Sequence, residues 1–188
     1  MKKEKVKKEK ILLHICCAPD ATYPSELLSN NFEVIGYYYN PNMDSDEEDK
    51  KRFEETKKVS DLFKFELINS RGNIKDREEW NNAIAGLENL PEGGTRCFKC
   101  IEFRLKKTAE KAKEKNIKVF TTTLTVSPHK NAFLINSIGK NIAEKFNLEF
   151  LKSNFKKNNG LKKTLEYSKE FNLYRQKYCG CIFSKRRS

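Results

Sequence analysis

Apolar and polar positions along the chain predict short strands that alternate with longer helices. Residues 11–15 form a continuous apolar run, which is typical of a buried strand. Further strands are expected at 32–39, 65–69, 118–125 and 148–151. Ser25 is expected to open a short helix, and longer helices are expected at 46–62, 76–88, 97–115, 131–146 and 161–171. This alternation predicts an α/β fold with a mostly parallel sheet and helices on both faces.

Polar residues stand at three points where an expected strand ends. Cys16 and Cys17 follow the first strand, Tyr39-Asn40-Pro41-Asn42 closes the second, and Ser127 follows the fourth. Ligands of such sheets bind outside the carboxyl ends of the strands, so we expect these loops to share one rim. The first loop has no glycine-rich phosphate-binding pattern, which argues against nucleotide hydrolysis by a P-loop.

The length of 188 residues is that of about one domain with its own hydrophobic core. We expect a basic, disordered lead-in over residues 1–10 and a single α/β domain over 11–188. No apolar run approaches the ~20 residues of a membrane span, and the charged first residues lack the apolar stretch of a secretion signal. The expectation is a cytoplasmic protein without membrane contact.

The formal net charge is +12, from 38 basic and 26 acidic residues. Such an excess attracts polyanions, nucleic acid among them, over long range. Lysine-rich helix faces that are merely solvated would produce the same excess. Charge alone therefore leaves both interpretations open.

The six cysteines form three close pairs, and a carboxylate follows the first pair: Cys16-Cys17 with Asp20, Cys97-x-x-Cys100, and Cys179-Gly180-Cys181. Thiolates are the ligands that iron, iron–sulfur clusters and zinc select. Six thiolates and a carboxylate exceed the four positions of one tetrahedral ion, which favours a cluster with a second metal or redox group beside it. Structural zinc and a disulfide framework are the alternatives, and the missing secretion signal argues against disulfides.

Motifs containing these cysteines occur in a fixed order along the chain. They are His14-x-Cys16-Cys17-Ala18-Pro19, Tyr39-Asn40-Pro41-Asn42, Gly94-x-Arg96-Cys97-x-x-Cys100-x-x-x-Arg104-Leu105, Thr121-Thr122-Thr123-Leu124-x-x-Ser127-Pro128 and Leu173-Tyr174-Arg175-Gln176-x-Tyr178-Cys179-Gly180-Cys181. Together they resemble the QueH-type epoxyqueuosine reductases, and the resemblance covers residues 11–184. Each motif alone has little specificity, whereas the ordered set is highly specific.

The resemblance implies a fold related to the adenine nucleotide α-hydrolases and the last step of queuosine biosynthesis. In that step, the epoxide of epoxyqueuosine at the wobble position of tRNA is reduced to an alkene. The resemblance also implies a 4Fe-4S cluster and an adjacent mononuclear metal, which we expect to be iron. The expected partners are tRNA bearing epoxyqueuosine and an electron donor that the sequence does not identify.

The spacing of the cysteines suggests how they divide between the two groups. Cys97 and Cys100 on one helical turn present two sulfurs to one metal centre, so they are expected to bind the cluster, together with Cys17 and Cys179. A carboxylate is a harder ligand than a thiolate. Asp20 is therefore assigned to the mononuclear metal with Cys16 and Cys181, and these three residues are expected to be catalytic.

The remaining motif residues are expected to contact the substrate. Arginine can hold phosphates or the modified base through its planar donors, and tyrosine rings can stack on an extruded base. The expected set is Tyr39, Asn40, Asn42, Arg96, Arg104, Ser127, Tyr174, Arg175 and Gln176. Alternatively, the arginines pair with carboxylates such as Glu48 and the tyrosines pack inside the fold. His14 is expected either to be a core histidine bonded to backbone or to orient a metal ligand.

Two other functions remain open at this point. A tRNA-thiolation or ATP-dependent transfer enzyme on a related fold needs a Gly- and Ser-containing phosphate loop after the first strand, which Cys16-Cys17-Ala18-Pro19-Asp20 does not provide. A zinc-stabilised RNA-binding module would use the same cysteines without redox chemistry.

We predict that the protein purified without oxygen is brown, with broad absorbance in the visible range, because an iron–sulfur cluster supplies the colour. Absorbance spectra and metal analysis of the same sample test this. A colourless protein that contains zinc would favour the RNA-binding module.

Overall fold

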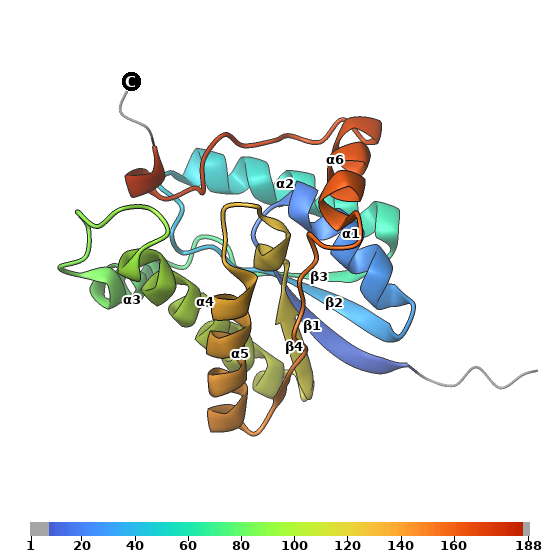
Figure 1. The fold of residues 1–188 in the computed structure, drawn as a ribbon, viewed down its shortest axis with the longest axis horizontal. Helices are drawn as coiled ribbons and strands as arrows, with labels where there is room; N and C mark the ends of the chain where they lie inside the picture. The colour runs from blue at the N-terminus through green and yellow to red at the C-terminus, as the bar shows by residue number, and fades with distance from the viewer. Residues whose placement is uncertain (1–7, 186–188) are drawn as a thin grey trace, which may run out of the picture.

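The computed structural model of the chain describes residues 8–185 and contains one five-stranded sheet (Figure 1). All neighbouring strands run parallel, in the order β3-β2-β1-β4-β5. The strands are β1 (Glu9–Ile15), β2 (Phe32–Tyr38), β3 (Glu66–Asn69), β4 (Val119–Thr122) and β5 (Glu149–Phe150). The predicted α/β class with a parallel sheet is confirmed.

Six α-helices surround the sheet within the described residues. They are α1 (Ala18–Ser29), α2 (Asp46–Phe63), α3 (Ile74–Ile84), α4 (Thr95–Glu114), α5 (Ala132–Phe146) and α6 (Gly160–Glu170). Two 3-10 turns lie at Thr123–Val126 and Ile182–Ser184. In the part of the chain that the structure describes, no helix is both long and apolar enough to cross a membrane.

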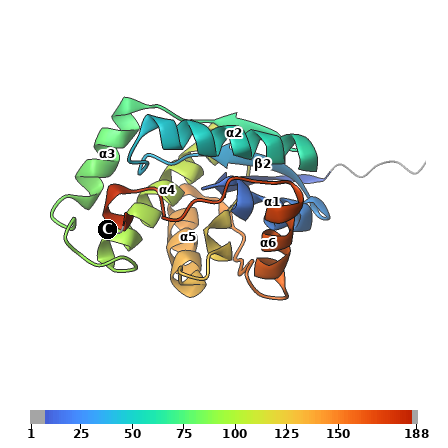
Figure 2. The same ribbon diagram turned by 90° about the horizontal axis from the view of Figure 1, so that it is seen from above.

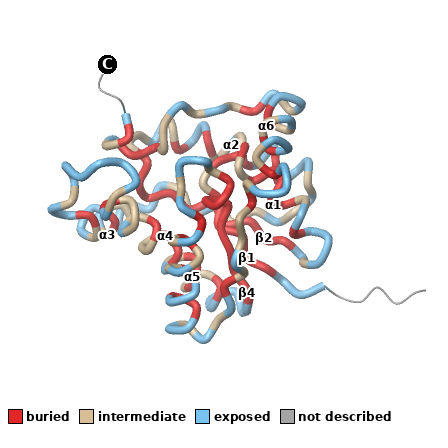
Figure 3. The backbone as a smooth tube through the Cα atoms, in the orientation of Figure 1, coloured by how far each residue is buried: buried red, intermediate tan, exposed pale blue. Residues whose placement is uncertain are grey.

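Alternation along β1 sends successive side chains into two separate cores. Leu12 packs with residues of α4 and α5, including Leu105 and Ile135, on one face. Leu13 packs with α1, α2 and the segments around α6 on the other face. Helices thus cover both faces, as Figure 2 shows from above, and the central strands are the most buried part of the chain (Figure 3).

One predicted helix start is wrong. Ser25 was expected at the start of a helix, but it lies inside α1, where its hydroxyl donates to the Ala21 carbonyl at 2.6 Å. The helix begins earlier because Pro19 occupies its first turn, where a missing N–H group costs nothing, and Cys17 takes the N-cap position. The first residues after β1 are therefore held in a helical turn rather than a loop.

Two other boundaries differ in a way that matters for the site. The strand expected at 118–125 ends at Thr122, whose hydroxyl accepts a hydrogen bond from the Leu124 N–H and turns the chain into a 3-10 helix. At the N-terminus, Glu9 and Lys10 belong to β1. The rest of the predicted lead-in lies almost wholly in residues 1–7, outside the described residues.

Asp49 on α2 makes the stability of the fold depend on pH. Its carboxyl is buried and accepts a hydrogen bond from the Tyr38 hydroxyl at 2.8 Å, and burial raises its pKa to about 6. A carboxyl with a raised pKa binds its proton more tightly in the folded chain. Its contribution to stability is therefore full below the unfolded pKa of about 4 and is lost as the pH rises through about 6.

We predict that Asp49→Asn, which keeps an acceptor for Tyr38, raises the free energy of unfolding by roughly 2 kcal/mol at pH 8 and by little at pH 4. Urea unfolding at both pH values measures the difference. Asp61→Asn on the exposed part of the same helix is the control and should show no such pH dependence. Equal effects of Asp49→Asn at both pH values would contradict the assignment.

Candidate functional site

The site lies where β1 ends between β2 and β4. Beyond β1 the chain continues into α1 on one face of the sheet, whereas the crossover helices α4 and α5 lie on the other (Figures 1 and 2). In doubly wound sheets, ligands bind in the crevice at such a point. The Cys16 amide donates to the Thr123 hydroxyl at 3.4 Å, which joins the loop after β1 to the turn after β4. The predicted rim is thereby confirmed for these two loops.

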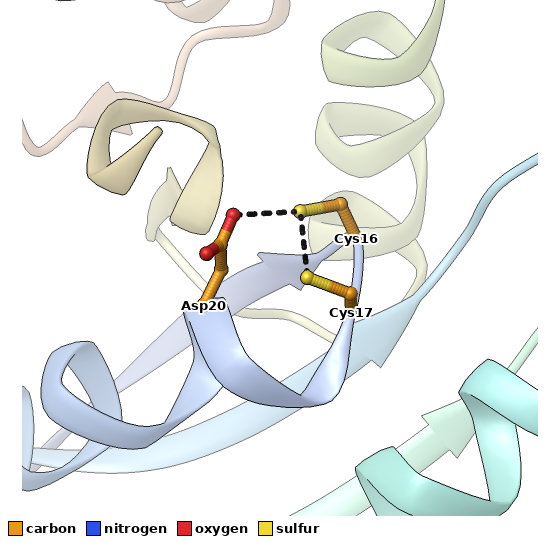
Figure 4. Close-up of side chains that lie close together, drawn as sticks. All are labelled: Cys16, Cys17 and Asp20. Atoms are coloured by element: carbon orange, nitrogen blue, oxygen red, sulfur yellow. Dashed lines mark hydrogen bonds between the residues drawn. The ribbon is translucent and has the colours of Figure 1, made fainter. Parts of the chain in front are cut away.

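Cys16, Cys17 and Asp20 form a compact group at this point (Figure 4). Their ligand atoms all lie within 4.8 Å of one another. Cys16 Sγ is 3.9 Å from Cys17 Sγ and 3.5 Å from Asp20 Oδ2. Because α1 begins directly after Cys17, its first turn brings the Asp20 carboxylate back beside both sulfurs.

The protonation of Cys16, Cys17 and Asp20 depends on their burial and on the hydrogen bonds and charges among them. The hydrogen bond with Cys17 holds the pKa of the Cys16 thiol well below its usual value. The same hydrogen bond, and to a smaller extent burial, raises the pKa of the Cys17 thiol well above its usual value. Burial, and then the negative charge of Cys16, raise the pKa of the Asp20 carboxyl well above its usual value. Of the three groups, Cys16 is thus the most readily charged, and a bound cation would favour deprotonation of the other two.

The other four cysteines line one cavity of about 180 Å³ beside this group: Cys97, Cys100, Cys179 and Cys181. The first two project from the first turns of α4, and the last two come from the C-terminal segment. Burial raises the pKa of the Cys100 thiol to about 11. All six cysteines lie within the described residues, and none of them is joined in a disulfide.

Two cations lie close to both cysteine groups. Arg104 is buried, donates to Asn40 Oδ1, and favours the charged form of both Cys16 and Cys100. Its Nε has no hydrogen-bond partner within residues 8–185. Lys130 Nζ lies 3.8 Å from Cys179 Sγ. Burial lowers the pKa of Lys130, but the charges of Cys179, Cys16 and Asp20 outweigh burial and raise it overall.

The two asparagine side chains in the loop after β2 differ in their hydrogen bonding. The Asn40 amide donates to the Ile15 carbonyl at 3.2 Å and so fixes this loop to the end of β1. Asn42 lines the cavity and is 2% exposed, and neither of its amide atoms has a hydrogen-bond partner among the described residues. A buried amide without partners carries an unmet desolvation penalty, so Asn42 is suited to receive a polar ligand group.

A group of polar contacts on α2 holds the C-terminal segment in place. Arg52 is buried, pairs with Glu48 at 2.7 Å, and donates to the carbonyls of Tyr178 at 3.3 Å and Cys179 at 3.1 Å. Gly180 has a φ of +108°, and a Cβ at this position would lie 2.7 Å from the Met43 sulfur. This close approach, which a side chain would prevent, brings both cysteines to the cavity.

Most residues that were predicted to bind the substrate use their polar groups or rings for contacts within the fold. Arg96 is buried and donates to the carbonyls of Glu88 and Leu90, so it holds the loop before α4. The fully buried ring of Tyr39 stacks on Tyr37 with a centroid distance of 5.4 Å, which gives it a packing role.

The remaining predicted contacts lie nearer the surface. The Tyr174 hydroxyl donates to Glu48 at 3.1 Å, and Ser127 Oγ accepts from the His129 amide at 3.3 Å. Arg175 is exposed and Gln176 is half-buried. Of the predicted substrate set, Asn42, Arg96 and Arg104 line the cavity.

His14 is a core histidine bonded to the backbone, which was one of the two expected roles. Its Nε2–H donates to the Tyr39 carbonyl at 3.1 Å, and its Nδ1 accepts from the Thr122 hydroxyl at 2.8 Å. We assign this tautomer because a carbonyl can only accept. Burial, and then the charge of Arg104, hold the pKa of His14 well below its usual value, so the ring is neutral.

Sequence reasoning missed four residues that organise the site: Arg52, Trp80, Thr123 and Lys130. Arg52 stands four residues after Glu48 on a predicted helix, a spacing typical of an ion pair. Lys130 stands two residues after the Ser127-Pro128 motif. No signal in the sequence connects either residue with the C-terminal cysteines.

The fold and this site define the chain as a cysteine-rich α/β protein with a candidate metal centre at the switch point of a parallel sheet. Residues 11–187 match the family described as Epoxyqueuosine reductase QueH. The chain belongs to this family, and it is an oxidoreductase.

Relatives carrying the name Epoxyqueuosine reductase QueH match most of the chain. The protein from Streptococcus pyogenes serotype M1 is 37% identical over 177 residues, which cover 93% of this chain and 69% of that protein. The Thermotoga maritima protein is 38% identical over 177 residues, covering 93% and 89%. The Staphylococcus epidermidis protein is 38% identical over 184 residues, covering 93% and 76%.

We predict that Arg52→Met loosens the segment that carries Cys179 and Cys181. The change removes two hydrogen bonds to its carbonyls and leaves Glu48 without its charged partner, so the free energy of unfolding should fall by about 3 kcal/mol. In metal-free, folded protein, iodoacetamide should modify Cys179 faster while the buried Cys17 is unaffected, as followed by mass spectrometry. Lys57→Ala, an exposed change on the same helix, is the control. Unchanged modification of Cys179 would show that Arg52 does not hold the segment.

Proposed function

We propose that this chain reduces the epoxide of epoxyqueuosine in tRNA to the alkene of queuosine, using a 4Fe-4S cluster and an adjacent mononuclear iron. The family membership supports the reaction, since the relatives are named for it. The net charge of +12 supports a polyanionic substrate. The observation that carries the cofactor part is the convergence of seven ligand residues in two adjacent groups.

The group at the end of β1 has the spacing of ligands around one ion. A metal–sulfur distance of about 2.3 Å in tetrahedral geometry separates two ligands by roughly 3.8 Å. The observed separations of 3.9 Å between Cys16 and Cys17 and 3.5 Å between Cys16 and Asp20 are close to this value. We therefore assign the mononuclear metal to these three residues.

The four cysteines around the cavity are then available for the cluster. A cluster with four thiolate ligands needs Cys97, Cys100, Cys179 and Cys181 together. Arg104 and Lys130 support this assignment, because they place positive charge beside the sulfurs. This division exchanges Cys17 and Cys181 relative to the one expected from spacing alone, since Cys17 lies beside Cys16 and Asp20.

Removal of an epoxide oxygen as water consumes two electrons and two protons, and side chains alone do not supply the electrons. The bound groups would supply electrons singly and Lewis acidity toward the epoxide oxygen. An external electron donor must return two electrons in each turnover, and solvent supplies the two protons. We assign to Asn42 a hydrogen bond to the substrate, because its amide is buried, faces the cavity and has no partner among residues 8–185. Arg104 keeps the surrounding ligands charged and is itself held by Asn40.

We predict that Asp20→Ala loses about one metal per chain, retains the cluster absorbance and loses most reductase activity. Cys97→Ala is expected to lose the cluster absorbance, because one ligand is missing. Iron, zinc and acid-labile sulfide analysis of both variants, with turnover measured on tRNA containing epoxyqueuosine, tests the assignment. Asp46→Ala is the matched control, since this aspartate is 80% exposed on α2.

Three outcomes would overturn parts of the proposal. Full iron and sulfide content in Cys97→Ala would remove Cys97 from the cluster. Unchanged metal content and turnover in Asp20→Ala would remove Asp20 from the second site. Zinc without sulfide in the unmodified protein would favour an RNA-binding module over a reductase.

A further inference from the structure

Phe133 is the most exposed large apolar side chain among the described residues. It is 79% exposed, although the ordinary position of phenylalanine is inside a fold. Its backbone is firmly placed at the start of α5, because the Asn131 side chain accepts hydrogen bonds from the amides of Phe133 at 2.9 Å and Leu134 at 3.2 Å. The ring is therefore presented to solvent from a rigid helix end, and its exposure is not caused by a loose loop.

This ring stands next to the cavity that the four cysteines line. Asn131 and Leu134, on either side of Phe133 in the sequence, both line that cavity. A second aromatic side chain, Phe98, lines it from the first turn of α4. Helices α4 and α5 lie side by side and begin at the same end of the sheet (Figures 1 and 2). One aromatic ring thus lines the cavity from α4, and another is exposed beside it on α5.

The chain around Phe133 is basic and well anchored. Lys130 precedes it, and the ammonium group of Lys156 donates to the carbonyls of Ser127 at 3.0 Å and Lys130 at 2.6 Å. Lys99 is exposed on the first turns of α4 beside Phe98. Two aromatic rings with the exposed Lys99 beside one of them are unlike the broad apolar patch of a protein interface. Aromatic rings set in a positively charged surface are the features that hold single-stranded nucleic acid.

We propose that Phe133 is a stacking platform for a base of the single-stranded RNA loop, next to the nucleoside that enters the cavity. The inference rests on the proposed function and adds the residue that positions the RNA. A target nucleoside can reach a buried site only when it leaves the stack of its neighbours, which exposes the face of an adjacent base. The Phe133 ring would cover that face while Lys99, exposed at the start of α4, contacts a phosphate.

The test is the affinity of the protein, with and without its metals, for an unmodified RNA hairpin with the sequence of the anticodon stem and loop. Phe133→Ala should weaken binding by about fivefold to a hundredfold, the range of one base–aromatic stack. Phe133→Trp should restore the affinity, whereas Phe133→Leu should not. The dependence of affinity on salt should keep its slope in Phe133→Ala, because no phosphate contact is removed.

Two controls separate stacking from general damage. Leu62→Ala changes an exposed apolar residue at the C-terminal end of α2 and should leave hairpin affinity unchanged. A long, fully paired RNA duplex should bind Phe133→Ala and the unmodified protein nearly equally, since all its bases except the terminal pairs are stacked on both faces.

The possible failures are distinguishable. Normal hairpin binding by Phe133→Ala, or loss of self-association in place of loss of RNA affinity, would overturn the role of Phe133 and leave the proposed function intact. Failure of the unmodified protein to bind the hairpin or to reduce the tRNA would overturn both.

Discussion

A permanent positive charge inside the protein is the constraint on which the site depends. The Arg104 side chain is 2% exposed, and its hydrogen bond goes to the neutral amide of Asn40. A buried guanidinium is unfavourable unless negative groups lie near it. Cys16, whose pKa is lowered, provides one, and Cys100 from the other cysteine group would provide a second once a bound metal deprotonates it. Arg104 therefore links the charge of the two groups, and metal binding, which deprotonates thiols, would satisfy the arginine as well.

The parallel sheet explains how residues far apart in the chain reach this charge. β1 is the central strand, so its C-terminal end is flanked by the ends of β2 and β4. The loops after these strands carry Cys16, Asn40 and Thr123. The Cys16 amide donates to the Thr123 hydroxyl, and the Asn40 amide donates to the carbonyl of Ile15, the last residue of β1. The C-terminal cysteines follow no strand of the sheet, and only the short 3-10 turn Ile182–Ser184 begins beside Cys181. Arg52 on α2 binds the carbonyls of Tyr178 and Cys179, and Gly180 permits the close approach of the segment.

The chemical types of the motif residues were clear before the structure, but their contacts were not. Arg96 and Arg104 were both expected at the substrate, and both line the cavity, yet the donors of Arg96 go to two backbone carbonyls of its own loop. Tyr39 was expected to stack on a base, and it stacks on Tyr37 in the core. An arginine or tyrosine looks the same in sequence whether its partner is a ligand or the fold, because partners are chosen by tertiary neighbours.

The sequence by itself determined the α/β class, the order of strands and helices with most of their boundaries, and the rim on which the first cysteine pair lies. Local patterns suffice for these features, because hydrophobic period, strand-forming residues and turn residues act over short distances. Only the tertiary structure decided that α1 begins at Ala18, that Cys17 joins Cys16 and Asp20, and that Arg52 holds the last cysteines. These depend on contacts across more than a hundred residues or on the rotation of one helical turn, and neither leaves a periodic signal in the sequence.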